Sequence, residues 1–156
     1  MRQAAVLIKA LEKQLAQSEE AIAQLITEDK TLQAKAQRLD AIPGVGLTTA
    51  AVLLAGLPEL GQISDEAAAL AGVAPYNQDS GGHAGARHIA GGRRAVRCAL
   101  YLSALSAVKH DAILKAFYLK LRAAGKPPKV ALVACMRKLV VLMNRLLKNP
   151  QLELAK

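Results

Sequence analysis

A serine followed by glycines, with several arginines close behind it, is the part of this sequence best suited to chemistry. Ser80 precedes two glycines, so its hydroxyl is sterically open to a bulky group such as a phosphodiester. A serine attacks such a group only when a base activates it. Asp79, His83 and His88 are close in sequence, but none has a spacing that dictates contact. Ser-Gly-Gly alone is typical of a turn, so these residues leave both a nucleophile and a plain turn open.

The arginines that follow could hold a phosphate beside this serine. They are Arg87, Arg93, Arg94 and Arg97. Arg93 and Arg97 are four residues apart, so on a helix they would share a face. Planar guanidinium groups bind phosphate oxygens through paired hydrogen bonds. We therefore predict that the four arginines bind phosphates of a nucleic acid.

The segment 42–50, Ile-Pro-Gly-Val-Gly-Leu-Thr-Thr-Ala, is a second candidate for phosphate binding. It resembles the hairpin of a helix-hairpin-helix unit, whose backbone amides at the start of the second helix hold one phosphate of a duplex. The predicted contacts are Gly44, Val45, Gly46 and Thr48. Pro-Gly-x-Gly also forms plain helix–helix turns, and residues 41–80 hold four acids and no Lys or Arg. A purely structural turn therefore stays open.

The positive charge of the chain lies in its second half. Residues 81–156 hold fifteen Lys or Arg against two acids, Asp111 and Glu153. Such a block predicts a nucleic-acid partner. An anionic membrane ranks lower because the charge is spread over several segments. Aromatic residues are only 3%, which favours duplex DNA over stacked single strands. Since no segment reads as a signal peptide or membrane span, we expect a cytoplasmic protein without membrane contact.

Residues 1–40 are expected to form one coiled-coil helix. Apolar residues repeat at two heptad positions over residues 4–39, with Ser18 and Asp29 as polar members that could fix the register. We therefore predict a homo-oligomer assembled through residues 4–39. The alternative is a long amphipathic helix folded back on its own domain.

Residues 41–150 are predicted to form a compact helical domain, and residues 151–156 a tail. Caps, glycines and prolines place helices at 47–57, 64–72, 93–110, 111–124 and 127–148. The apolar run 139–143 is expected at the centre of the bundle. Residues 73–92, with six glycines at or within their borders, form a long loop of the kind that is usually functional. No strand is predicted, so the fold class is all-α.

Several of these motifs, taken in order over roughly residues 40–125, resemble the C-terminal domain of the IS-one-ten family of insertion-sequence transposases. These enzymes are also described as bridge-RNA-guided recombinases and are related to pilin-gene invertases. The matching segments are 42–46, 70–75, Ser80-Gly81, Gly85, Ile89, Gly91 and 97–100. The resemblance implies that Ser80 attacks DNA to form a phosphoserine link, and that a guide RNA is a possible partner. It also implies a separate RuvC-like domain, whose four acidic residues bind divalent metal.

This sequence departs from that family in two places. The family usually has Gly-Asn before the helix that carries its arginine, whereas this chain has Gly91-Gly92, which would remove a capping side chain. The RuvC-like domain is also missing, so we expect no metal or other cofactor in this chain. We expect a fragment or truncated product that is not active alone.

Three functions remain open on the sequence. The first is the serine half of a composite strand-exchange site in DNA transposition. The second is a non-catalytic, oligomeric nucleic-acid-binding module. The third is a coiled-coil assembly module with an incidental basic surface, which leaves the basic second half of the chain unexplained.

Overall fold

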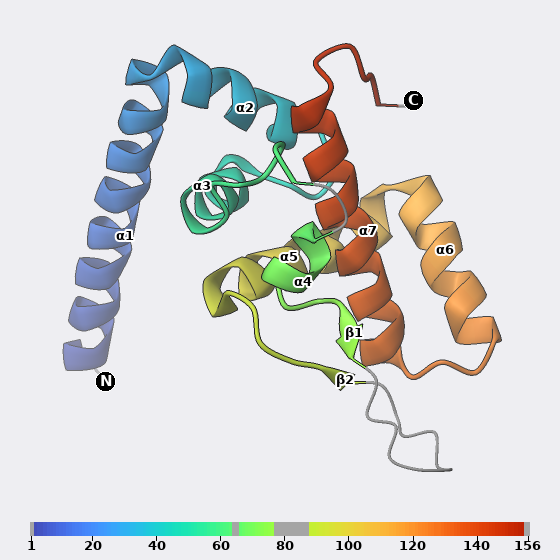
Figure 1. Ribbon diagram of the computed structural model, residues 1–156. Helices are drawn as coiled ribbons and strands as arrows, with labels where there is room; N and C mark the ends of the chain where they lie inside the picture. Colours follow the sequence, from blue (N-terminus) through green and yellow to red (C-terminus); the bar gives the residue numbers. More distant parts are fainter. Residues whose placement is uncertain (1, 64–65, 77–87, 155–156) are drawn as a thin grey trace.

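The computed structural model describes residues 2–63, 66–76 and 88–154, and most of the described part is helical (Figure 1). The all-α prediction is confirmed. The helices are α1 (Arg2–Glu28), α2 (Lys30–Asp40), α3 (Leu47–Gly56), α4 (Ala67–Leu70), α5 (Arg94–His110), α6 (Ala112–Ala123) and α7 (Pro128–Lys148). Among the described residues, no helix is both long and apolar enough to cross a membrane.

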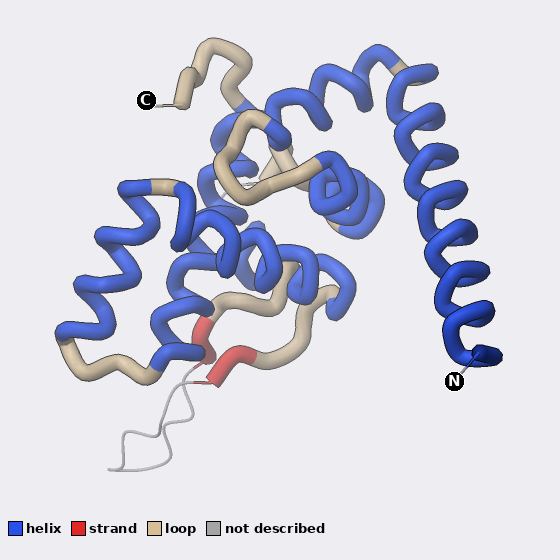
Figure 2. The backbone as a smooth tube through the Cα atoms, turned by 180° about the vertical axis from the view of Figure 1, so that it is seen from behind, coloured by secondary structure: helices blue, strands red, loops and turns tan. Residues whose placement is uncertain are grey.

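The expected single helix over residues 1–40 is instead two helices that meet at Asp29. The Asp29 carboxylate accepts hydrogen bonds from the backbone N–H groups of Thr31 (2.8 Å) and Leu32 (3.1 Å) and so begins a new helix. An Asp at this position offers the backbone a competing partner, which a heptad count does not register. α1 therefore stands apart on one side of the molecule (Figure 2), while Leu39 at the end of α2 is buried in the core.

The core is built around α7, which packs against α2, α4, α5 and α6. Leu139, Val140 and Met143 are fully buried, which confirms the central position expected for this run. Val141 and Leu142 are half-buried and line a groove on the side of α6. The expected caps are also present, since Asp111 accepts a hydrogen bond from Leu114 N at 2.8 Å at the start of α6.

A buried amide holds the connection between α3 and α4 against α7. The Asn144 side chain is 4% exposed, accepts a hydrogen bond from Gly61 N at 2.7 Å and donates one to Ile63 O at 2.8 Å. Because buried polar atoms need partners, this side chain fixes the path of the connection. Glu59 lies in the same connection and is hydrogen-bonded to Arg93 at the start of α5.

The prediction that the chain has no strand is wrong in one short place. β1 (Pro75–Tyr76) pairs antiparallel with β2 (His88–Ile89), with Pro75 opposite Ile89 and Tyr76 opposite His88. Strands of two residues are too short to give an alternating pattern, so the sequence carries no signal for them. The ribbon joins the two ends of segment 77–87. Ser80 and Arg87 belong to that segment and lie outside the described residues.

Candidate nucleic-acid interface

The turn between α2 and α3 is held by short backbone hydrogen bonds and by contact with α5. Ile42 N donates to Leu39 O, and Val45 N donates to Ile42 O, both at 3.0 Å. Gly44 has a φ of 87°, and a Cβ there would lie 2.5 Å from the backbone nitrogen of Ala107. Only glycine satisfies both conditions, so Gly44 is required for the turn itself.

Gly46 and Thr48 lie on the outside of this turn, at the exposed start of α3. Gly46 is the N-cap residue and has no side chain to accept from the first-turn amides. A Cβ at Gly46 would meet nothing within 4 Å, so a bulky group can approach the backbone there. The Val45 side chain is 3% exposed, so this residue can offer only its backbone. The arrangement provides unshielded amides at a positive helix end.

Just before α5, the backbone at Gly91 and Gly92 crosses closely over the backbone at Gly72. Gly72, Gly91 and Gly92 all have positive φ, and a Cβ on Gly92 would lie 2.2 Å from Gly72 N. Arg93 N donates to Leu70 O at 3.0 Å beside this crossing. The N-cap residue of α5 is Arg93, one position after the second glycine, and no side chain caps this helix start, as expected for a chain without the family's Asn. The glycine is needed there for close packing.

The Arg93 side chain is hydrogen-bonded to two other residues of the chain, Glu59 and Gly56. Its guanidinium donates to both carboxylate oxygens of Glu59, at 2.6 Å each, and to Gly56 O at 3.0 Å. This hydrogen bonding lowers the pKa of Glu59 to about 2 and raises the pKa of Arg93. These three hydrogen bonds leave part of the guanidinium free, and the Arg93 side chain is 39% exposed. Binding of a phosphate by Arg93 therefore stays a prediction.

Arg94 and Arg97 are the two remaining arginines at the start of α5. The Arg94 side chain is exposed and makes no hydrogen bond to another side chain or backbone group among the residues that the structure describes. Arg97 is half-buried and donates to Gly91 O at 2.5 Å. Cations are disfavoured at the positive end of a helix, so this placement lowers stability unless an anion binds nearby.

The two candidate phosphate sites lie at opposite ends of a helix pair. Gly44, just before α3, packs against Ala107 in the second half of α5, whereas Gly56 at the end of α3 packs against Val96 near the start of α5. The two helices therefore run antiparallel. α3 has ten residues and is roughly 15 Å long at 1.5 Å per residue. One phosphate cannot touch both sites, although one duplex could.

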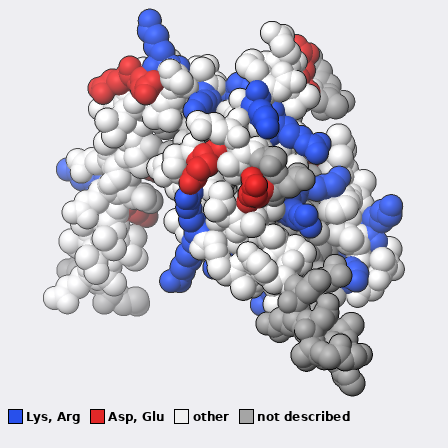
Figure 3. All heavy atoms as spheres, in the orientation of Figure 1, with Lys and Arg blue, Asp and Glu red and all other residues white. Residues whose placement is uncertain are grey.

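Basic side chains extend beyond these sites over α6 and α7. Residues 112–148 contain nine Lys or Arg and no acid. Figure 3 shows Lys and Arg spread over the face that includes these helices. Within the described part of the chain, no group of three or more His, Cys, Asp and Glu is placed to hold a metal ion. The surface is suited to anions, and its described residues do not fit a divalent metal.

A comparison with protein families matches the segment that holds both candidate phosphate sites. The model of the transposase IS116/IS110/IS902 family matches residues 36–119, which include the α2–α3 turn, segment 77–87 and the start of α5. An uncharacterized 43.6 kDa protein of insertion element IS110 from Streptomyces coelicolor is 32% identical over 114 residues. The match covers 71% of this chain and 28% of that relative, so the chain spans little more than a quarter of its length. The chain belongs to the IS116/IS110/IS902 family of transposases.

Proposed function

We propose that this chain is the DNA-engaging part of an insertion-sequence transposase and contributes the serine half of a composite strand-exchange site. The family match over residues 36–119 is the observation that supports this most, because it spans both candidate phosphate sites and Ser80. We expect this activity in the bacterial cytoplasm, where the element's DNA lies.

Duplex DNA is the expected partner, held by its backbone. The backbone N–H groups at the start of α3, beside Gly46 and Thr48, would donate hydrogen bonds to one phosphate without reading sequence. Arg94 and Arg97 would hold another phosphate at the start of α5, and Arg87 would add to it from segment 77–87. Arg93 has a different part in this proposal: through Glu59 it fixes the position of the helix that carries the other two.

In the proposed reaction the Ser80 hydroxyl attacks a DNA phosphate. A bond forms between Ser80 Oγ and phosphorus, and the bond from phosphorus to one deoxyribose oxygen breaks. The displaced oxygen takes up a proton, and the serine proton passes to a base that the described residues do not identify. Arginine side chains would stabilise the negative charge of the transition state. The resemblance implies that metal-binding carboxylates would be supplied by the family's RuvC-like domain.

The second candidate function is a non-catalytic nucleic-acid-binding module. The uninterrupted basic charge of residues 112–148 favours it, because that surface lies outside the serine segment. A guide RNA is a possible partner of the same surface. In either function we infer that copies associate through the apolar side of α1, where Leu11 and Leu15 are more than half exposed.

A Ser80→Ala variant separates the two functions. In the complete transposase context, we expect this variant to bind duplex DNA as before but to lose strand exchange. A covalent protein–DNA adduct at residue 80 should be recovered from the serine protein and not from the alanine variant. Strand exchange by Ser80→Ala would contradict the catalytic assignment and leave the binding module as the function.

A further inference from the structure

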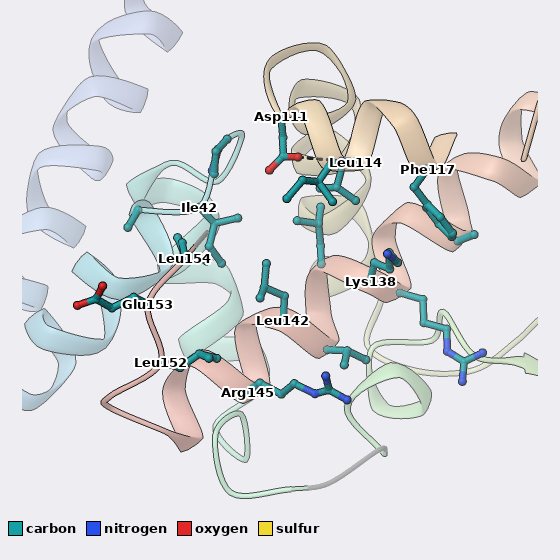
Figure 4. Close-up of a pocket in the computed structure, with 17 residues that line it drawn as sticks. Ile42, Asp111, Leu114, Phe117, Lys138, Leu142, Arg145, Leu152, Glu153 and Leu154 are labelled. Atoms are coloured by element: carbon teal, nitrogen blue, oxygen red, sulfur yellow. Dashed lines mark hydrogen bonds between the residues drawn. The ribbon is translucent and has the colours of Figure 1, made fainter. Parts of the chain in front are cut away.

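A groove of about 920 Å³ lies between α6 and α7 and is closed at one end by the α2–α3 turn and the C-terminal segment (Figure 4). Its wall is largely apolar and includes Ile42, Leu114, Leu142 and Leu154. Ile113 on its edge is 60% exposed. Apolar surface of this kind, open to water, is typical of a binding site for another protein segment.

Basic side chains form the rim of the groove. Arg137 and Arg145 line it and are exposed, and Lys138 lies 4.4 Å from the centre of the Phe117 ring. Two acids also line it. The Asp111 carboxylate is used as the cap of α6, and Glu153 lies on the C-terminal segment. The groove therefore favours an apolar ridge that carries negative charge along its border.

α1 presents such a ridge. Its heptad residues Leu11, Leu15 and Leu25 are 56%, 61% and 62% exposed. Glu12 and Glu19 directly follow two of the heptad positions and border the ridge. Anchors at this spacing are typical of a helix that lies in an apolar groove.

Pairing of α1 with a second α1 would leave these glutamates without opposite charges. In a two-helix coiled coil the residues that flank the seam interact across the interface. Those residues of α1 are Ala5, Leu7, Glu12, Gln14, Glu19, Ala21, Ile26 and Glu28, with no Lys or Arg among them. The basic rim of the groove supplies the complementary charge that a second α1 lacks.

The ridge and the groove of one chain do not meet. Among the helices of the described chain, α1 contacts α2 and α3 only, and it lies on the opposite side of the molecule from α6 (Figures 1 and 2). A concave groove also cannot be filled by the same groove of another copy, whereas a helix is convex. We propose that α1 of one copy docks into the α6–α7 groove of a second copy, which rests on the self-association inferred above.

Charge reversal with compensation tests this docking. Sedimentation velocity would compare the wild-type chain with Arg137→Glu/Arg145→Glu, with Glu12→Lys/Glu19→Lys, and with all four substitutions together. We expect each pair to weaken self-association by about tenfold, and the four together to restore most of it. Lys120→Glu/Lys129→Glu is the matched control, because it makes the same change in charge outside the groove and should leave association unchanged.

A photocrosslinker in place of Ile113 gives a second measurement that does not depend on charge. With mixed heavy- and light-isotope copies, crosslinks should join residue 113 to residues 8–25 of another copy. A monomeric wild-type chain would overturn the proposal. Loss of association in Leu15→Glu with none in Arg137→Glu/Arg145→Glu would also overturn it, and would indicate that α1 pairs with α1. Crosslinks confined to other segments, or no restoration in the fourfold variant, would count against it equally.

Discussion

Arg93 and Glu59 form a two-point salt bridge, in which Nη1 and Nη2 of the guanidinium each lie 2.6 Å from one carboxylate oxygen. The same guanidinium donates to Gly56 O, so it ties the start of α5 to the end of α3. Two side chains 34 residues apart in sequence thereby fix the position of the helix start that carries Arg94 and Arg97. This bridge positions the proposed phosphate site at the start of α5.

The salt bridge should make the free energy of unfolding depend on pH in the acid range. Its hydrogen bonds hold the pKa of Glu59 at about 2, below the ordinary value of 4.5. The stabilisation is therefore fully present above pH 4.5 and is lost as the pH falls from there through about 2. Glu59→Gln should be less stable than wild type at pH 7 and should lose less stability between pH 5 and pH 2.5, as measured by urea unfolding. Parallel curves for the two proteins would contradict this role for the bridge.

The two glycines of the α2–α3 turn should respond differently to alanine. Gly44→Ala combines a φ of 87° with a contact to the α5 backbone, so we expect a loss of about 2 kcal/mol or more in the free energy of unfolding. Gly46→Ala has open space and ordinary backbone angles, so its loss should stay near 1 kcal/mol or below. Denaturant titration of both variants checks this. Equal losses would mean that the turn does not pack on α5 as described.

Removing the buried amide of Asn144 should lower the free energy of unfolding more than removing an exposed amide nearby. Asn144→Ala removes the partners of Gly61 N and Ile63 O, which should cost about 1–3 kcal/mol of unfolding free energy. Gln62→Ala, on the exposed part of the same connection, should change it by about 0.5 kcal/mol or less. If thermal and chemical unfolding ranked the two variants in the reverse order, the connection would not be anchored by α7.

The helices from α5 onward could be predicted from the sequence because their ends carry local signals. Asp111 caps α6, Gly125 follows it with positive φ, and Pro128 begins α7. The sequence pattern does not predict the break at Asp29, because a polar residue at a heptad position also fits an uninterrupted coiled coil. Only the local hydrogen bonds of its side chain show that a new helix begins there.

The candidate site was only partly predictable, since its geometry depends on contacts between distant residues. The sequence indicates that Arg93, Arg94 and Arg97 are cations at a helix start, but it cannot show that Glu59 occupies the first of them. The same holds for Gly72 and Gly92, whose close crossing depends on the path of the chain between them. The sequence shows that these positions are glycines, but it does not show which backbone segment each glycine packs against.

Salt-dependent binding of the chain to a duplex tests the DNA-engaging role most directly. Affinity for a short DNA duplex would be measured by fluorescence anisotropy over a range of salt concentrations, for wild type, for Arg94→Ala/Arg97→Ala and for Lys9→Ala/Lys13→Ala on α1. Each lost phosphate contact should reduce the slope of log affinity against log salt by about 0.9. We therefore expect the α5 variant to bind more weakly, with a slope smaller by about 2, and the α1 variant to match wild type. Equal slopes for all three proteins would contradict the assignment of Arg94 and Arg97 as phosphate ligands.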